Sequence, residues 1–359
     1  MPMRFLIPSG VLLLAPAMAA PAAANEASWA ERLEFSGDFR LRYESIDADG
    51  LSEQSRGRYR LRLNAGIDLY DDLRFVVSLA TAADNPISRN VTFGGNSTSD
   101  NFGVDLAYVE WQPRPGLEVL AGKMKNPMFL PGKDQLVYDN DLNPSGMAVR
   151  FTPGRTFLAA GAFIVRERAQ SDDTFVYHGQ AGIEWELGGT TFTTGAGYVA
   201  VTNTVGNLPF FFDLPAGNTV DAMNRYVFEY ENAEVFAELD AALYDRPLRL
   251  FAHYTENLEV SRNDSAVALG LLLGKAEVAG SWELGWTFKD LEADAVVGSF
   301  TESDFGGGGT GVDGHVLRGD YVLRERLKLG ATVFLNEDSF RDDLEDYRRV
   351  QLDLEFEFE

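Results

Sequence analysis

Residues 58–69 alternate strictly between polar and apolar side chains, and no other feature of the chain constrains its fold as much. Arg58, Arg60 and Arg62 share one parity, and the places between them hold tyrosine or leucine. A period of two is typical of a β-strand, because successive side chains of a strand point to opposite faces of the sheet. The run is about twice as long as a common globular strand and matches the roughly 9 to 11 residues that cross a bilayer. It therefore predicts a transmembrane strand with one face toward lipid and the other toward water.

The same alternation recurs along the rest of the chain, where tight turns and long links separate the segments in turn. An even number of such segments, with short connections at one end and long ones at the other, is typical of a bacterial outer-membrane barrel. We therefore predict an all-β, transmembrane antiparallel β-barrel of about 16 strands, with short periplasmic turns and long extracellular loops. The segments are 33–44, 57–70, 73–84, 104–112, 116–125, 146–152, 155–167, 174–187, 190–203, 225–243, 248–258, 264–273, 280–299, 313–323, 326–337 and 346–358.

Residues 1–24 are predicted to be a secretory signal peptide. Arg4 precedes an apolar stretch, and three alanines that end at Ala24 offer a small-residue cleavage site. A helical membrane anchor is the weaker alternative, because the stretch is too short and Pro8 and Pro16 interrupt it. The mature chain, 25–359, is then expected to be one pore domain in the bacterial outer membrane.

Composition and motifs exclude several other classes of protein. A net charge of -24 disfavours a nucleic-acid partner, and the absence of cysteine removes disulfides and thiol chemistry. The three histidines, His178, His253 and His315, show no metal-ligand spacing. Residues 139–144 begin like a calcium loop but carry proline where that loop requires glycine. We therefore expect no cofactor and no metal.

Two stretches and the closing segment carry a family resemblance. The stretches are "AGKMKNPMFLPGKDQLVYDNDLNPSGMAVRF" (121–151) and "DLEADAVVGSFTESDFGGGGTGVDGH" (290–315), and with 346–358 they resemble the putative-porin family of Gram-negative bacteria. The resemblance implies a water-filled channel for passive diffusion of small hydrophilic solutes or ions, with no enzymatic activity. It also implies contact with outer-membrane lipid and, as in general porins, a homotrimer. By itself, the glycine-rich run 304–315 predicts a flexible surface loop.

The resemblance to general porins further implies that the third long link, 126–145, folds into the lumen and constricts the channel. This link carries acidic residues, and opposed acids and bases across a narrow wet gap set up a field that orders polar solutes. The predicted acidic side consists of Asp134, Asp139 and Asp141, with Lys133 beside them. The predicted basic side consists of Arg40, Arg42, Arg58, Arg60, Arg62 and Arg74, and Lys123 and Lys125 are added although their parity leaves their facing open.

The sequence leaves alternatives open for the arginines and for the function. The arginines could create a modest anion preference or bind a solute that carries a carboxylate, or they could fill the lumen and pair with acids on neighbouring strands. An outer-membrane barrel enzyme with a Ser-His pair is a second function class, although no pattern pairs a particular serine with a histidine. A secreted all-β adhesin or carbohydrate-binding protein is a third, and it would partition into water.

Overall fold

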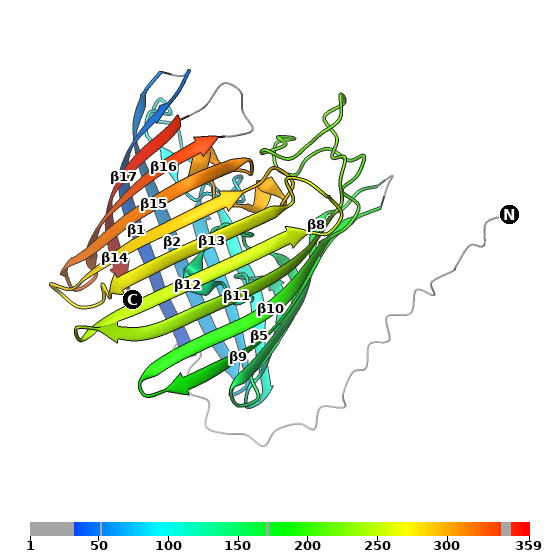
Figure 1. The fold of residues 1–359 in the computed structure, drawn as a ribbon. Helices are drawn as coiled ribbons and strands as arrows, with labels where there is room; N and C mark the ends of the chain where they lie inside the picture. The colour runs from blue at the N-terminus through cyan, green and yellow to red at the C-terminus, as the bar shows by residue number, and fades with distance from the viewer. Residues whose placement is uncertain (1–31, 51, 170–171, 339–345) are drawn as a thin grey trace.

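The first strand pairs on both of its edges, which closes the sheet into a barrel. β1 (Leu33–Ala48) hydrogen-bonds to β2 (Gln54–Tyr70) and to β17 (Asp346–Phe358), antiparallel in both cases (Figure 1). A closed sheet satisfies its backbone hydrogen bonds internally, as a lipid environment requires. The computed structural model describes residues 32–50, 52–169, 172–338 and 346–359, so the predicted signal peptide lies outside the described residues.

Sixteen strands form the wall, and the predicted all-β barrel of about 16 strands is confirmed. A seventeenth strand of the sheet, β4 (Val91–Thr92), is a two-residue piece that pairs with β2 beyond the end of β3. The remaining wall strands are β3 (Leu73–Thr81), β5 (Phe102–Arg114), β6 (Leu117–Lys123), β7 (Ser145–Phe151), β8 (Thr156–Arg166), β9 (Thr174–Leu187), β10 (Thr190–Val201), β11 (Tyr230–Leu243), β12 (Arg246–Asn257), β13 (Ser265–Gly274), β14 (Trp282–Leu291), β15 (Val312–Arg324) and β16 (Leu327–Asp338).

The strands carry apolar side chains outward and charged side chains inward. On β1, Leu41 and Tyr43 are exposed, whereas Arg42 between them is buried. This arrangement is the reverse of a water-soluble protein and suits a wall with lipid outside and water within. Among the described residues, no helix has the length and apolarity needed to cross a membrane.

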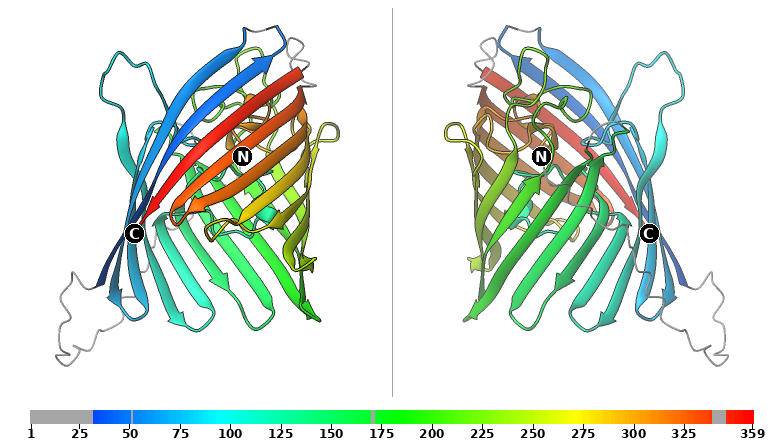
Figure 2. Two further views of the ribbon diagram at one scale, coloured as in Figure 1. Left: turned by 90° about the vertical axis from the view of Figure 1, so that its left-hand side faces the viewer. Right: turned by 90° about the vertical axis from the view of Figure 1, so that its right-hand side faces the viewer.

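Tight turns lie along one rim of the barrel and long links along the other (Figure 2). The turn between β9 and β10 is made by Gly188 and Gly189, whose φ angles are 59° and 86°. A two-residue hairpin with left-handed backbone at both places favours glycine and matches the twist of the flanking strands. β1 begins and β17 ends at the rim of the tight turns, which is the rim predicted to face the periplasm.

The packed core lies inside the barrel, toward the rim of the long links. It is built by side chains from links 124–144, 202–229 and 292–311 together with inward residues of the wall. Because these links fill the lumen, they narrow it. Buried members of the core include Leu136, Phe210, Tyr226, Phe300 and Phe305, and three short 3₁₀ helices lie in the described parts of the links: η2 (Pro131–Lys133), η3 (Gly298–Phe300) and η4 (Phe305–Gly307).

Two expectations for the chain after β14 are wrong. The strand predicted at 280–299 ends at Leu291, because the apolar residues beyond it pack into the core of the links and not into the wall. The glycine-rich run 304–315 is not a flexible surface loop, because most of it is buried inside the barrel or belongs to β15. A Cβ on Gly309 would lie 2.4 Å from the carbonyl oxygen of Ala216. The glycine therefore permits close backbone packing.

Candidate functional site

The link between β6 and β7, residues 124–144, lies inside the barrel, and we call it the inward loop (Figure 1). Leu136 at its centre is fully buried, and η2 packs against β11, β12 and β13 across the lumen. The backbone N–H of Gly132 donates to Glu238 of β11 at 2.6 Å. The loop is thus attached to the wall opposite its own strands.

A buried set of histidines and carboxylates holds the inward loop in place, and we call Asp134, His178, Glu234 and His253 the histidine anchor. His253 Nδ1 lies 3.1 Å from Asp134 Oδ2, and its Nε2 lies 3.3 Å from Glu234 Oε2. Glu234 also lies 2.9 Å from His178 Nε2. A carboxylate faces each ring nitrogen of His253, and this arrangement favours the doubly protonated, cationic ring. Asp134, predicted as a free acid of the constriction, has its charge compensated within the anchor.

Arginines of β1 and β2 lie directly opposite one another. Arg40 is in register with Arg60, and Arg42 with Arg58. Together with Arg62 they form what we call the arginine wall. Their side chains are only 6% to 25% exposed, so neighbouring groups cover most of their surface.

Carboxylates of neighbouring elements pair with the arginine wall. Arg42 binds both oxygens of Asp353 on β17 at 2.7 Å and lies 3.1 Å from Asp304 of link 292–311. Arg60 lies 2.7 Å from Asp38 on β1. Bidentate arginine–carboxylate pairs are among the strongest hydrogen-bonded contacts in proteins. The arginines therefore pair with acids on neighbouring strands, as one of the two interpretations expected, while Arg40, Arg42 and Arg60 still line an open cavity.

Sequence reasoning missed several members of this cluster, among them Glu44, Asp304 and Arg349. Arg349 on β17 lies 2.7 Å from Glu44 and 2.7 Å from Asp304, and the fully buried Glu44 also pairs with Arg58. Burial acts to raise the pKa of Asp304, but Arg349 and Arg42 outweigh it and hold that pKa below its ordinary value. The parity of β1 and β17 could have identified Glu44 and Arg349, whereas no local pattern marks Asp304.

The two other predicted acids of the inward loop differ in their electrostatic setting. Asp141 Oδ1 lies 3.9 Å from Arg62. Burial acts to raise the pKa of Asp141, but Arg60 and Arg62 outweigh it and lower that pKa below its ordinary value. Asp139 accepts a hydrogen bond from the backbone N–H of Ser303 at 2.9 Å, yet burial and the charge of Asp141 raise its pKa to about 8.

Three predicted basic residues lie away from the arginine wall. Arg74 pairs with Glu34 and, at 3.1 Å, with Asp68, toward the rim of the tight turns. Lys123 ends β6 and Lys125 lies at the start of the inward loop, and their Nζ atoms are 3.0 Å and 3.5 Å from backbone carbonyl oxygens of the loop. Burial lowers the pKa of Lys125. The structure therefore does not bring these three side chains into the pairing network of the wall.

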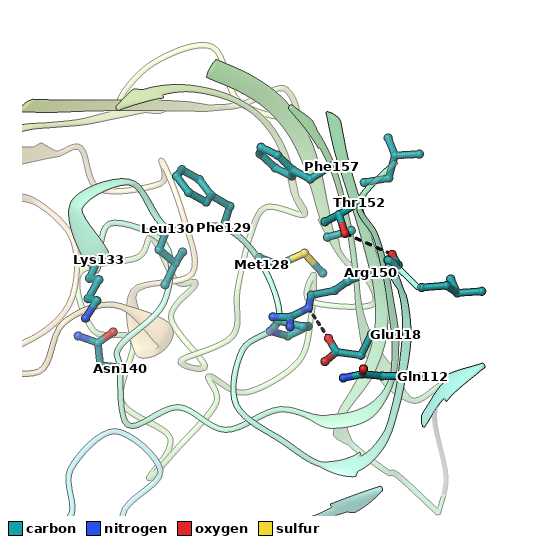
Figure 3. Close-up of a pocket in the computed structure, with 15 residues that line it drawn as sticks. Gln112, Glu118, Met128, Phe129, Leu130, Lys133, Asn140, Arg150, Thr152 and Phe157 are labelled. Carbon is teal, nitrogen blue, oxygen red and sulfur yellow. Dashed lines mark hydrogen bonds and ion pairs between the residues drawn. The ribbon is translucent and has the colours of Figure 1, made fainter. Parts of the chain in front are cut away.

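The space inside the barrel divides into connected cavities. An outer vestibule of about 780 Å³ faces the rim of the long links, and an inner chamber of about 640 Å³ lies beyond it. A third cavity, of about 590 Å³, lies between the inward loop and the wall near Phe157 (Figure 3). Four residues line both the vestibule and the inner chamber and so mark the eyelet where the two meet: Ile87, Ser88, Ser303 and Asp304.

Comparison with known proteins decides the family. Residues 48–209 and 219–358 match the family model described as "Putative porin". The chain belongs to this porin family. Together with the barrel, membership makes it an outer-membrane channel through which small hydrophilic solutes diffuse passively. A barrel enzyme is not favoured, because His178 and His253 belong to the anchor and, among the described residues, no serine hydroxyl hydrogen-bonds to a histidine. A secreted adhesin is not favoured either.

Solved porins share the fold of this porin at low sequence identity. The high-pH structure of OprB from Pseudomonas putida superposes with a TM-score of 0.65 and 14% identity, over 92% of this chain and 95% of that chain. A mutant porin from Rhodopseudomonas blastica gives 0.53 and 13%, over 91% of this chain and 100% of that chain. These likenesses concern the fold alone. No curated protein matches the sequence.

Proposed function

We propose that the eyelet, bordered by the arginine wall and the inward loop, is the selective part of the channel and gives a modest preference for anions. The observation that carries the proposal is the network of ion pairs around the eyelet. Within the described residues it consists of two neighbouring sets of ion pairs, which together contain eight basic groups and six carboxylates, an excess of two positive charges. The basic members are Arg40, Arg42, Arg56, Arg58, Arg60, Arg62, Lys328 and Arg349, and the acidic members are Asp38, Glu44, Asp141, Asp304, Asp353 and Glu355.

For a passing ion, the excess beside the eyelet outweighs the acidic composition of the chain as a whole. Exposed charges on the outer links are screened over about 8 to 10 Å at ordinary salt, whereas an ion in the eyelet passes within that distance of the wall. Reversal potentials of the purified protein in planar bilayers, measured across a KCl gradient, test the proposal. Chloride should permeate somewhat better than potassium. A clear preference for potassium would contradict it.

Export and assembly are part of the same proposal. Residues 1–24 direct the chain to the periplasm and are removed, and the barrel inserts into the outer membrane. The apolar outer faces of neighbouring barrels associate into a trimer, as in general porins. The protein catalyses no reaction. N-terminal sequencing of the mature protein and mass measurement in mild detergent test the cleavage and the trimer.

The anion preference is expected to weaken as the pH rises through about 8, because Asp139 then ionises beside the eyelet. Its raised pKa keeps the carboxyl neutral at lower pH, and deprotonation adds one negative charge to the lumen. Reversal potentials on either side of this pKa measure the step. Asp139→Asn, which stays neutral, should not show this change in reversal potential. The control variant Asp71→Asn, at a tight turn, should still show it. If the reversal potential of Asp139→Asn still changes at this pH, a different group titrates there.

The orientation of the barrel predicts which rim can be reached from outside the cell. A bulky thiol reagent should label Ser97→Cys on intact cells, because Ser97 is exposed on link 82–101. Asp71→Cys, at the tight turn between β2 and β3, should react only after the outer membrane is permeabilised. The chain has no natural cysteine, so the background is low. Labelling of position 71 on intact cells would show that the topology is inverted.

A further inference from the structure

Two unlike groups of side chains line the outer vestibule. One group is basic and consists of Arg56, Arg58 and Arg349. The other group is apolar and belongs to a stretch of link 202–229 that we call the apolar ledge: Phe211, Phe212, Leu214 and Pro215. The vestibule has a volume of about 780 Å³, which is within the size range of sites for small organic molecules.

The side chains of the apolar ledge are exposed to water although they are hydrophobic. Phe212 is 65% exposed and Leu214 60% exposed, and both line the vestibule. The backbone is left-handed at Phe211, Phe212 and Asp213, with φ of 53°, 63° and 54°. Three consecutive non-glycine residues in this conformation are strained, and such strain concentrates at functional sites. Exposed apolar surface rimmed by polar groups is typical of places where another molecule binds, ligand grooves among them.

The basic group keeps donors available for a ligand. Arg56 gives its Nε–H to Glu44, but its two terminal nitrogens make no hydrogen bond with the described residues, and its side chain is 34% exposed. Glu44 is shared by three arginines and is itself fully buried, so it lies behind them and does not reach the vestibule. The only carboxylate among the described residues that line the vestibule is Asp304. The lining therefore favours an anion.

A similar pairing of apolar and basic groups recurs beyond the eyelet (Figure 3). In the third cavity, Phe129 of the inward loop packs on Phe157 of the wall, with ring centroids 5.4 Å apart. Lys133 and Arg150 line the same cavity, and Arg150 is half exposed although it pairs with Glu118. The third cavity, which shares Lys133 and Asn140 with the inner chamber, thus also combines apolar and cationic groups.

We propose that the outer vestibule is a binding subsite for small organic carboxylates with an aromatic or otherwise apolar body, of the size of benzoate. The carboxylate binds the terminal nitrogens of Arg56, for which a planar guanidinium is suited. The ring rests on the apolar ledge near Phe212 and removes its surface from water. This inference rests on the proposed function, because it assigns a substrate class to the anion-preferring channel.

Block of the KCl current by benzoate in planar bilayers tests the subsite. Benzoate added to the extracellular side should reduce the single-channel current at lower concentration than acetate, which lacks the ring, or benzylammonium, which carries the opposite charge. Arg56→Gln should raise the half-blocking concentration of benzoate about tenfold, because it removes a charge-assisted hydrogen bond. Phe212→Ser should raise it severalfold and should leave acetate unaffected.

Matched controls lie outside the vestibule. Benzoate should block the current through Arg246→Gln, at a tight turn, and through Phe93→Ser, on link 82–101, at the same concentration as in the wild type. Equal block by benzoate and acetate, or no change in Arg56→Gln and Phe212→Ser, overturns the subsite while KCl conduction and its anion preference stand. A channel that prefers potassium in KCl alone overturns the proposed function instead. The two failures are therefore distinguishable.

Discussion

Replacing Arg58, Arg60 and Arg62 together by alanine is expected to turn the anion preference of the channel into a cation preference. The change removes three positive charges from a network with an excess of two, so the carboxylates predominate. Asp38 loses both of its arginine partners. A unit charge about 8 Å from a passing ion contributes about 0.5 kcal/mol in water, and about 0.2 kcal/mol after screening over one Debye length. Because the lost charges act with opposite sign on chloride and potassium, removing three of them shifts the permeability ratio about tenfold.

Reversal potentials in a KCl gradient measure this shift, and heat-dependent migration on gels shows whether the barrel has folded. Arg74→Ala is the matched control, because Arg74 pairs with Glu34 and Asp68 away from the network. Asp141→Asn, which removes a carboxylate near Arg62, should shift the potential in the opposite direction. If the triple variant folds and keeps the wild-type potential, the arginines serve only to fill the lumen.

The wall of the barrel could be predicted from the sequence because its signal is local. Within each strand the side chains alternate between lipid and water, and this period of two is visible without knowledge of the partner strand. The opposition of Arg42 to Arg58 depends on the register of β1 and β2, which the sequence did not determine because a long link was expected between the two strands. The strand ends were less certain, and the apolar residues after Leu291 have the composition of a strand although they pack among the links.

The interior could not be predicted in the same way because its contacts join distant parts of the chain. Asn218 holds link 292–311 by donating to the carbonyl oxygens of Ala293 and Val296, both at 2.8 Å. Neither stretch carries a pattern that points to the other. Likewise, Arg349 meets Glu44 only because the last strand pairs with the first, which the closure of the barrel brings about. The arginines were therefore found from parity, but several of their partners were not.

The histidine anchor illustrates the same limit. His253 and Asp134 are 119 residues apart in sequence. The spacing of the histidines in the sequence indicated no metal site. It also gave no sign that the imidazole of His253 lies between two carboxylates. What the sequence does supply is the inward parity of Glu234 and His253 on neighbouring strands. The contribution of Asp134 depends on the path of the inward loop, which only the structure reveals.

Replacing His253 by alanine is expected to release the inward loop and to raise the single-channel conductance severalfold. The change leaves Asp134 and Glu234 buried without the cation between them. Breaking a buried ion pair in this way costs about 3 to 5 kcal/mol, which the loop avoids by moving out into water. The lumen then loses part of the segment that narrows it, and the current becomes larger and noisier.

Single-channel recording in planar bilayers, with limited proteolysis of the loop in detergent, measures this effect. His315→Ala is the matched control, because His315 stacks on Trp286 at the wall, outside the anchor, and should leave the conductance unchanged. Combining His253→Ala with Asp134→Asn and Glu234→Gln removes the unpaired charges and should recover part of the wild-type conductance. Wild-type conductance in His253→Ala itself would mean that hydrophobic packing around Leu136 is sufficient to hold the loop.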